Sequence, residues 1–188
     1  MVFISNNHQN SILKQLTDEE LMHDVSKGNL DAMTFLFERY HLRIYNFLFQ
    51  MVRDKAVCDD LTQNVFYKAI RYRTSYKGGM FVSWIFKIAR NIFSDYYQKQ
   101  KRLQSNVVVE QLADINVESV TDQTEEIAHL YSAMEKLKME DRELIVMNRI
   151  QGMKYDSIAE LIGSSEGAVK VKIHRIINKL RTVYFETI

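Results

Sequence analysis

The sequence contains no proline, only six glycines in 188 residues, and one cysteine. This scarcity of turn-forming residues argues against an all-β fold, which needs glycine and proline at its many turns. The lone Cys58 excludes an internal disulfide and a thiolate zinc cluster. No apolar run reaches the roughly 20 residues that cross a membrane, and residues 1–15 lack a signal-peptide pattern. We therefore expect a soluble, cytoplasmic, helical protein without membrane insertion.

The motifs of common enzyme and cofactor sites are also missing. The sequence has no G-x-x-x-x-G-K-[ST], no G-x-G-x-x-G and no G-x-S-x-G, and its histidines form no H-x-x-x-H pair. The adjacent acids Asp59 and Asp60 would point about 100° apart on a helix, which is a poor geometry for a two-metal site. The sequence therefore predicts neither an enzyme, including one that acts on nucleic acid, nor a bound cofactor or metal.

The charges that are present are segregated along the chain, although the formal net charge is only +1. Residues 16–103 hold fourteen Lys and Arg against ten acids, residues 104–127 hold six acids and no Lys or Arg, and residues 128–188 hold ten Lys and Arg against eight acids. Hydrophobic residues make up 46% of the chain, which is enough for packed cores. The pattern predicts an all-α fold of two helical domains, 16–103 and 128–188. A flexible acidic linker at 104–127 joins them, and an N-terminal tail occupies 1–15.

Apolar spacing and capping signals predict four helices in the first domain. A capping box from Thr17 to Glu20 begins a short helix that ends near Lys27, and a long helix follows over residues 30–53. Asp54 caps the third helix, whose expected buried positions are Val57, Leu61, Val65, Phe66 and Ile70. After a loop over 71–80, the fourth helix covers 81–102. Its expected apolar face is Phe81, Trp84, Ile85, Ile88, Ile92 and Tyr96.

The second domain begins near Thr124 and ends in a helix-turn-helix pattern. Two apolar stripes come first: Ile127, Leu130, Tyr131, Met134 and Leu137, then Leu144, Ile145, Met147 and Ile150. A helix over 155–162 follows, with small Ala159 where two helices approach and Gly163 suited to the positive φ of the turn. Ser165 caps a last helix that extends to about residue 184.

The last helix has an apolar and a basic face. Val169, Ile173, Ile176, Leu180 and Tyr184 are expected to be buried, and Lys172, Arg175 and Lys179 form a basic stripe. In a major groove, the helix N-terminus would present its side chains to base edges while the cations hold phosphates. In the first domain, the loop residues Tyr72 and Tyr76 are better candidates for stacking on unpaired bases than Phe81 and Trp84, whose spacing is that of core residues.

Four segments, in order along the chain, resemble bacterial sigma factors of the extracytoplasmic-function (ECF) group. They are residues 37–40, 60–66, 81–96 and the helix-turn-helix that ends at 169–175, and the resemblance covers about residues 16–103 and 128–186. It implies a transcription initiation factor that binds core RNA polymerase, directs it to promoter DNA and helps to melt the −10 region. It also implies a free monomer and an anti-sigma partner that holds the factor inactive.

The resemblance implies roles for matching positions, none of them catalytic. The −35 element would be bound by Lys154, Ser165, Glu166, Gly167, Ala168, Lys170, Lys172, His174, Arg175 and Lys179. The −10 element would be bound by Tyr72, Tyr76, Lys77, Gly78, Trp84, Lys87, Arg90 and Asn91, with the loop at 72–80 capturing an unpaired base. Core polymerase would be bound by Asp59, Asp60, Gln63, Asn64 and Phe66.

Three positions depart from the family's pattern. Asn64 stands where an acid usually follows the glutamine, which puts a charged contact to the polymerase clamp in doubt. Lys138 stands where a proline commonly follows the leucine, so we expect a differently shaped turn. Lys154 replaces the usual Ser or Thr cap, which would loosen that helix end.

A helix-turn-helix regulator with an α-helical sensor domain is the alternative interpretation. It explains the C-terminal half of the chain but leaves the patterns at 60–66 and 81–96 unused. Such a regulator would bind a two-fold site as a dimer, whereas an initiation factor would be monomeric.

Overall fold

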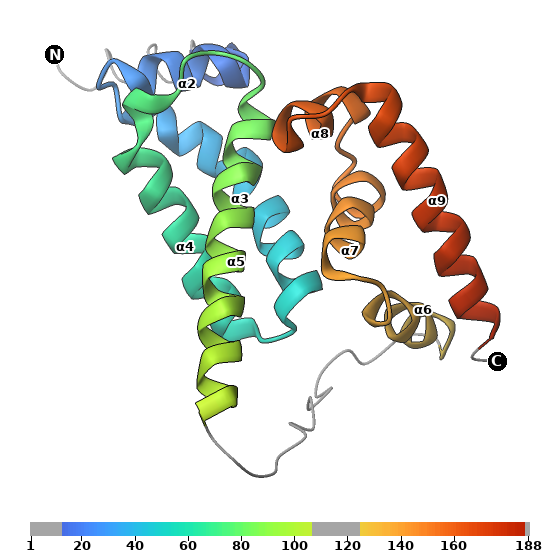
Figure 1. Cartoon of the computed structure of the whole chain (residues 1–188). Coiled ribbons are helices and arrows are strands. Elements are labelled where there is room, and N and C mark those ends of the chain that lie inside the picture. Colours follow the sequence, from blue (N-terminus) through green and yellow to red (C-terminus); the bar gives the residue numbers. More distant parts are fainter. Residues whose placement is uncertain (1–12, 107–124, 187–188) are drawn as a thin grey trace, which may run out of the picture. The chain divides into compact units, whose positions relative to one another are not determined.

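The computed structural model describes residues 13–106 and 125–186, which divide into two compact units (Figure 1). Unit 1 covers residues 1–97 and unit 2 covers 98–188. Unit 1 holds α2 (Asp18–Ser26), α3 (Asp31–Val52), α4 (Lys55–Arg71), the 3-10 turn η1 (Arg73–Ser75) and most of α5 (Phe81–Asn106). Unit 2 holds α6 (Glu125–Glu135), α7 (Met139–Ile145), the π-helix η2 (Val146–Ile150), α8 (Tyr155–Ile162) and α9 (Glu166–Phe185).

The described residues contain helices and no strand, which confirms the predicted all-α fold with two helical domains. Most of the predicted linker (107–124) and of the predicted tail (1–12) lies outside the described residues. Among residues 13–106 and 125–186, no helix has the length and apolarity needed to cross a membrane.

The predicted helix starts are confirmed by their capping bonds. Thr17 and Glu20 form a capping box at α2, in which the Thr17 backbone N–H donates to the Glu20 carboxylate over 2.8 Å. This bond, together with one from the Thr17 hydroxyl, lowers the pKa of Glu20 below its usual value. Asp54 accepts from the N–H of Val57 at the start of α4, over 3.0 Å.

Unit 1 is a helical bundle in which α5 runs beside α3 and α4, with α2 across their ends (Figure 1). Aromatic side chains join α3 to α5: Phe47 meets Phe86 and Tyr40 meets Phe81, both edge to face. The buried face of α5 is wider than the sequence predicts, because Phe86, Ala89 and Phe93 are also buried while Trp84 and Ile88 are only half-buried. A helix that contacts more than one neighbour needs such a wide apolar face.

The predicted buried stripe of α4 is partly wrong. Val65 and Phe66 are buried as expected, but Val57, Leu61 and Ile70 are only half-buried. The small residues Cys58, Thr62 and Ala69 are buried instead. Helix α3 packs along α4, and small side chains allow two helices to approach closely. The spacing of the large apolar residues alone therefore predicts the wrong buried face for α4.

Unit 2 departs from the prediction at the end of its second apolar stripe. The helix expected there widens into a π-helix, in which Gln151 N–H donates to the carbonyl of Val146 over 2.9 Å. The additional residue in the turn changes the phase of the helix, and Ile150 is 42% exposed instead of buried. In the first apolar stripe, Met134 of α6 and Leu137, just after it, are buried as predicted, but Ile127 and Leu130 are exposed.

Candidate DNA-binding and polymerase-binding surfaces

The turn between α8 and α9 has the geometry that the sequence predicts for a helix-turn-helix. Gly163 ends α8 in the left-handed conformation, at φ 66°, and the N–H of Ser164 donates to the carbonyl of Ala159 over 2.9 Å. Ser165 then caps α9 by accepting from the N–H of Ala168 over 3.2 Å. Ala159 and Ile158 are buried where α8 packs on α9. These contacts fix the angle at which α9 leaves the turn.

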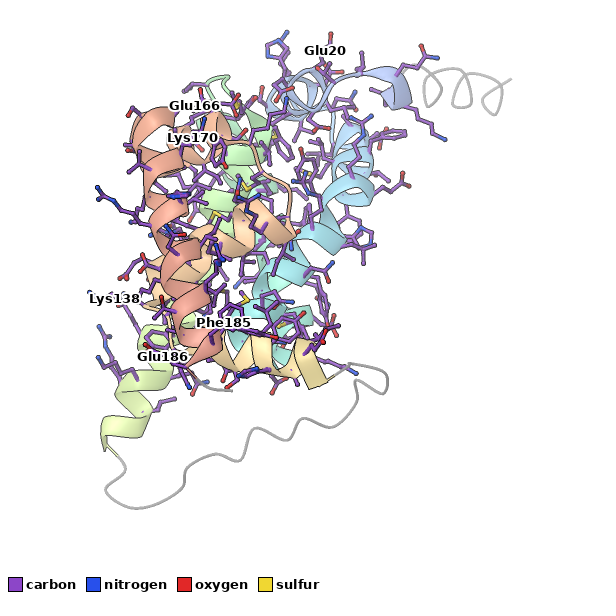
Figure 2. The ribbon with its side chains drawn as sticks, turned by 90° about the vertical axis from the view of Figure 1, so that its right-hand side faces the viewer. Glu20, Lys138, Glu166, Lys170, Phe185 and Glu186 are labelled. Atoms are coloured by element: carbon purple, nitrogen blue, oxygen red, sulfur yellow. The ribbon has the colours of Figure 1, made fainter. Side chains whose placement is uncertain are left out.

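The long helix α9 presents the predicted DNA-binding residues to solvent. Val169, Ile173 and Ile176 are buried and form its inner face. Every predicted −35 residue is exposed, and Glu166 and Lys170 lie at one end of α9 while Phe185 lies at the other (Figure 2). The full exposed set is Lys154, Ser165, Glu166, Gly167, Ala168, Lys170, Lys172, His174, Arg175 and Lys179.

The two lysines that depart from the family's pattern each stand at the start of a helix, and neither side chain caps that helix. Lys154 is the residue before α8 and makes no side-chain capping bond, as expected for a lysine in place of Ser or Thr. The Asp156 carboxylate compensates in the first turn by accepting from the N–H of Ser157 over 2.6 Å. Lys138 likewise precedes α7 without a side-chain bond.

The loop before α5 is held by its own hydrogen bonds. The Tyr76 hydroxyl donates to the carbonyl of Gly79 over 2.6 Å, and the Tyr76 ring meets Trp84 edge to face at 5.6 Å. Gly78 and Gly79 have φ of 93° and 87°, which favours glycine at both positions. Tyr76 is only 8% exposed, so it supports the loop from within and is not the open stacking platform that the sequence suggests.

The other predicted −10 residues differ in accessibility. Tyr72 is 46% exposed, and the Arg71 guanidinium lies 5.8 Å from the centre of its ring. Trp84 and Arg90 are half-buried, and Trp84 packs against Tyr76 and Phe81 as a core residue would. The exposed members of the set are Tyr72, Lys77, Gly78, Lys87 and Asn91.

An open pocket of about 540 Å³ lies between this loop and α2. Volumes of roughly 300–1,000 Å³ are typical of small-ligand sites. The loop contributes Thr74, Tyr76, Lys77, Gly78 and Gly79, and α2 contributes Glu19, His23 and Ser26. The three α2 residues are absent from the candidates that the sequence suggests, because no pattern in the chain connects α2 with a loop some fifty residues later.

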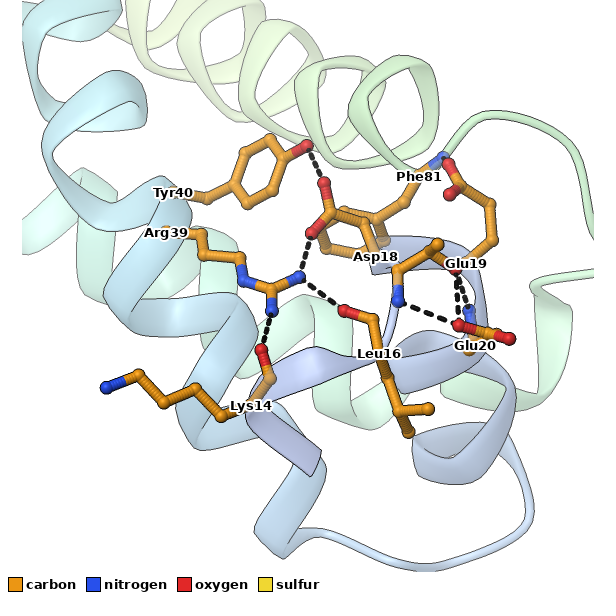
Figure 3. Close-up of polar contacts among 9 residues, drawn as sticks. Lys14, Leu16, Asp18, Glu19, Glu20, Arg39, Tyr40 and Phe81 are labelled. Atoms are coloured by element: carbon orange, nitrogen blue, oxygen red, sulfur yellow. Dashed lines mark hydrogen bonds and ion pairs between the residues drawn. The ribbon is translucent and has the colours of Figure 1, made fainter. Parts of the chain in front are cut away.

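A polar network fastens the segment from Lys14 to Asp18 to α3 (Figure 3). The Asp18 carboxylate pairs with the Arg39 guanidinium at 2.7 Å and accepts from the Tyr40 hydroxyl at 2.5 Å. Arg39 also donates to the carbonyls of Leu16 and Lys14, each over 2.9 Å. Burial, followed by the hydrogen bond to Asp18, raises the pKa of Tyr40 well above its usual value. The network therefore holds the beginning of α2 in place.

The exposed side of α4 carries four of the five predicted polymerase-binding residues: Asp59, Asp60, Gln63 and Asn64. Phe66 is the exception, because it is only 5% exposed and meets the ring of Phe37 edge to face at 4.8 Å. Phe37 itself is 43% exposed and stacks on His41. Of this pair of rings, Phe37 and not Phe66 is therefore accessible to a partner.

Comparison with known proteins identifies the two halves of the chain. Residues 36–103 match sigma-70 region 2, and residues 127–180 match sigma-70 region 4. The RNA polymerase sigma factor CarQ of Myxococcus xanthus is 32% identical over 161 residues, which are 85% of this chain and 92% of CarQ. The chain is a sigma factor of the sigma-70 family.

Further relatives place this sigma factor in the ECF group. SigX of Bacillus subtilis, an ECF sigma factor, is 27% identical over 162 residues, which cover 80% of this chain and 82% of SigX. Among solved structures, CnrH in complex with the cytosolic domain of CnrY has the same fold, with a TM-score of 0.68, 24% identity, and coverage of 88% of this chain and 96% of that one. The sigma factor is therefore a transcription initiation factor, and the regulator with a sensor domain is ruled out.

The match to region 2 begins at residue 36, so it includes most of α3, all of α4 and the loop before α5. The match to region 4 contains the helix-turn-helix. Helix α2, which forms one wall of the pocket, precedes the matched part of the sigma factor.

Proposed function

We propose that this sigma factor recruits core RNA polymerase through α4, reads the −35 element with α9 and opens the −10 element at the loop before α5. The observation that carries the proposal is the exposed, capped N-terminal turn of α9 with basic residues along the same helix, because a helix of this kind can enter a major groove. The same chain carries a second accessible set of residues at 72–91, on the other unit.

For the −35 element, we propose that the two ends of α9 contact different parts of the DNA. Ser165, Glu166 and Lys170 lie at its N-terminal end, where a docked helix contacts base edges. Arg175 and Lys179 lie further along, where they would bind phosphates and fix the register of the helix on the duplex. Base contacts would then provide specificity and phosphate contacts would provide affinity.

For the −10 element, we propose that the pocket between α2 and the loop receives an unpaired base. Tyr72, two residues before Thr74 of the pocket lining, offers an exposed ring, and Lys77 and Lys87 are exposed cations for the backbone. Taking a base out of the stack costs a few kcal/mol, so the pocket needs only to trap the base once it has left the duplex. No catalytic residue is required for this step.

For core polymerase, we propose the exposed residues of α4 together with Phe37 of α3. A surface with acidic residues beside an exposed aromatic ring suits a protein partner, since aromatic side chains are enriched at interfaces. An anti-sigma factor covering this surface would block polymerase. The sigma factor RpoE of Bartonella quintana, whose structure was solved in complex with the anti-sigma factor NepR, shares the fold at a TM-score of 0.64 and 21% identity. We expect a free monomer in the cytoplasm, where polymerase acts.

Two substitutions, each measured for binding to core polymerase and to DNA, test whether α4 and α9 carry separate binding surfaces. Asp60→Arg should weaken binding to core polymerase at least several-fold and leave binding of the polymerase-free chain to duplex DNA unchanged. Lys170→Ala should lower the affinity of the assembled complex for promoter duplex and leave core binding unchanged. Glu135→Arg, at an exposed position of α6, is the control for charge reversal. Equal effects of Asp60→Arg and Glu135→Arg on core binding would contradict the assignment of α4.

A further inference from the structure

The first residue of α5 is held by a side chain from a distant helix. The N–H of Phe81 donates to the Glu19 carboxylate over 3.0 Å, across 62 positions of sequence (Figure 3). The first N–H groups of a helix have no partner within the helix, and a local Ser, Thr, Asp or Asn usually satisfies one of them. Here the residues before Phe81 are Gly78, Gly79 and Met80, which have no capping side chain. Glu19 supplies the missing cap, with a negative charge that also suits the positive end of the helix dipole.

This bond lies at the end of the loop before α5, where we propose that the −10 element is opened. Phe81 directly follows the loop, and the ring of Tyr40 packs on Phe81 from α3. Within the loop, the Tyr76 hydroxyl holds the carbonyl of Gly79, and the space around the α-carbon of Gly78 is open. The Glu19 bond adds an attachment to α2 at the residue where the loop ends and α5 begins.

Glu19 also stands in the wall of the pocket. Helix α2 forms one side of the pocket and the loop forms the other. The Glu19 side chain reaches from α2 to Phe81, the residue that follows the loop. Asp18, the preceding residue, fastens the same turn of α2 to Arg39 and Tyr40 of α3. The distance between the two walls is thus set by a chain of contacts from α3 through Asp18 and Glu19 to Phe81.

We propose that Glu19 is a positioning residue for promoter opening: it fixes the start of α5 and, through it, the width of the pocket between α2 and the loop. The proposal rests on the proposed function, because it assigns a role to the pocket that would receive the unpaired −10 base. Glu19 lies outside residues 36–103, the part of unit 1 that matches region 2. The role follows from the contact with Phe81 and from the pocket wall, not from direct contact with DNA.

The test compares substitutions of Glu19 that separate reach from charge. Glu19→Gln keeps an oxygen at the same distance and can still accept from Phe81, whereas Glu19→Asp keeps the charge but is shorter by one methylene, and Glu19→Ala removes the acceptor. Each full-length variant is assembled with core polymerase, and its affinity for core and its rate of −10 opening on duplex promoter are measured. We expect opening to fall about tenfold with Ala and Asp, in line with a lost hydrogen bond to a charged group. Gln should stay near wild type, with core affinity unchanged throughout.

The neighbouring Glu20 provides the control. Glu20→Ala also removes an exposed acid from the first turn of α2, and it breaks the capping box but not the bond to α5. It should therefore open promoters like wild type. Opening by Glu19→Ala at the wild-type rate, or an equal loss with Glu20→Ala, would overturn the proposal. If the Ala variant does not fold, the order of the Gln and Asp variants decides: Asp opening as fast as Gln overturns it.

Failure of the proposed function gives a different result from failure of this inference. A wild-type protein that does not open any promoter with core polymerase contradicts the proposed function itself. Normal opening by the wild type, with no difference among the Glu19 variants, leaves the proposed function intact and removes only the positioning role.

Discussion

Arg39 of α3 holds the segment from Lys14 to Asp18. Its guanidinium reaches the Asp18 carboxylate and the carbonyls of Leu16 and Lys14 at the same time. The planar fork of an arginine can serve several acceptors in fixed directions, whereas the ammonium group of lysine cannot reproduce that geometry. The positive charge alone is therefore insufficient at this position.

Arg39→Lys should lower the free energy of unfolding of unit 1 by about 1–2 kcal/mol, because hydrogen bonds from a charged donor are lost. Chemical denaturation followed by circular dichroism measures the change. Combining the substitution with Asp18→Asn should give less than the sum of the two single effects, because the two side chains share one contact. Strict additivity would show that they act independently.

Cys58 is completely buried in α4, and burial raises the pKa of its thiol to about 12. Because the thiolate is the reactive form, the folded protein should resist alkylation at pH 8. Labelling with iodoacetamide should be slow in buffer and fast in denaturant, as followed by mass spectrometry. Equal labelling rates in the two conditions would contradict the buried environment.

Arg53 ends α3 in the left-handed conformation with φ of 63°, which is unfavourable for any residue with a β-carbon. Arg53→Gly and Arg53→Ala both remove the side chain, but only glycine relieves the backbone. The Gly variant should therefore be more stable than the Ala variant by about 1 kcal/mol. Thermal unfolding of the pair measures this difference, and an Ala variant as stable as the Gly variant would argue against the left-handed end.

Among the helices, α9 depends on its cap for the orientation of the end that we propose binds DNA. Ser165→Ala removes the bond to the N–H of Ala168 and should destabilise unit 2 by about 1 kcal/mol. Ser165→Asp keeps an acceptor at the same place and should preserve stability. Denaturation of both variants tests the pair, and equal losses would show that the hydroxyl does not cap the helix.

The basic residues of α9 should make promoter binding sensitive to salt. If Arg175 and Lys179 contact phosphates, alanine at either should weaken binding of the polymerase complex and reduce the slope of log affinity against log salt by about one. Lys138→Ala, an exposed lysine before α7, is the matched control and should keep the wild-type slope. Unchanged slopes in both α9 variants would argue against direct phosphate contact.

Most helices could be predicted from the sequence, because their signals are local. The Thr17 box, the Asp54 and Ser165 caps and the turn at Gly163 each depend on residues a few positions apart. The π-helix at Val146–Ile150 could not be predicted, since a change of helical phase leaves no trace in an apolar pattern.

The candidate site could be predicted where exposure follows from helical phase, and not where it depends on tertiary contacts. The exposed face of α9 is of the first kind. The burial of Phe66 and Tyr76 depends on tertiary contacts. Phe37 covers Phe66, and the hydrogen bond to Gly79 turns Tyr76 inward. Glu19 is also of the second kind, although the missing cap before Phe81 is a signal that an acceptor must come from elsewhere.

For the molecule as a whole, the proposal of two DNA-binding units on one chain has a consequence for the free protein. Two linked units strengthen each other only when their spacing matches the two promoter elements. Polymerase would fix that spacing. The isolated chain should therefore bind duplex promoter weakly, and a gel-shift assay that shows tight, sequence-specific binding without polymerase would contradict this expectation.

The most direct measurement is run-off transcription by core RNA polymerase on a pool of promoters from the host, with and without this protein. We predict that the protein makes core polymerase initiate at discrete sites, and that the aligned start regions share −10 and −35 sequences. Core polymerase that stays inactive, while the protein alone shifts duplex DNA as a dimer, would contradict the assignment of the two surfaces to promoter opening and promoter reading.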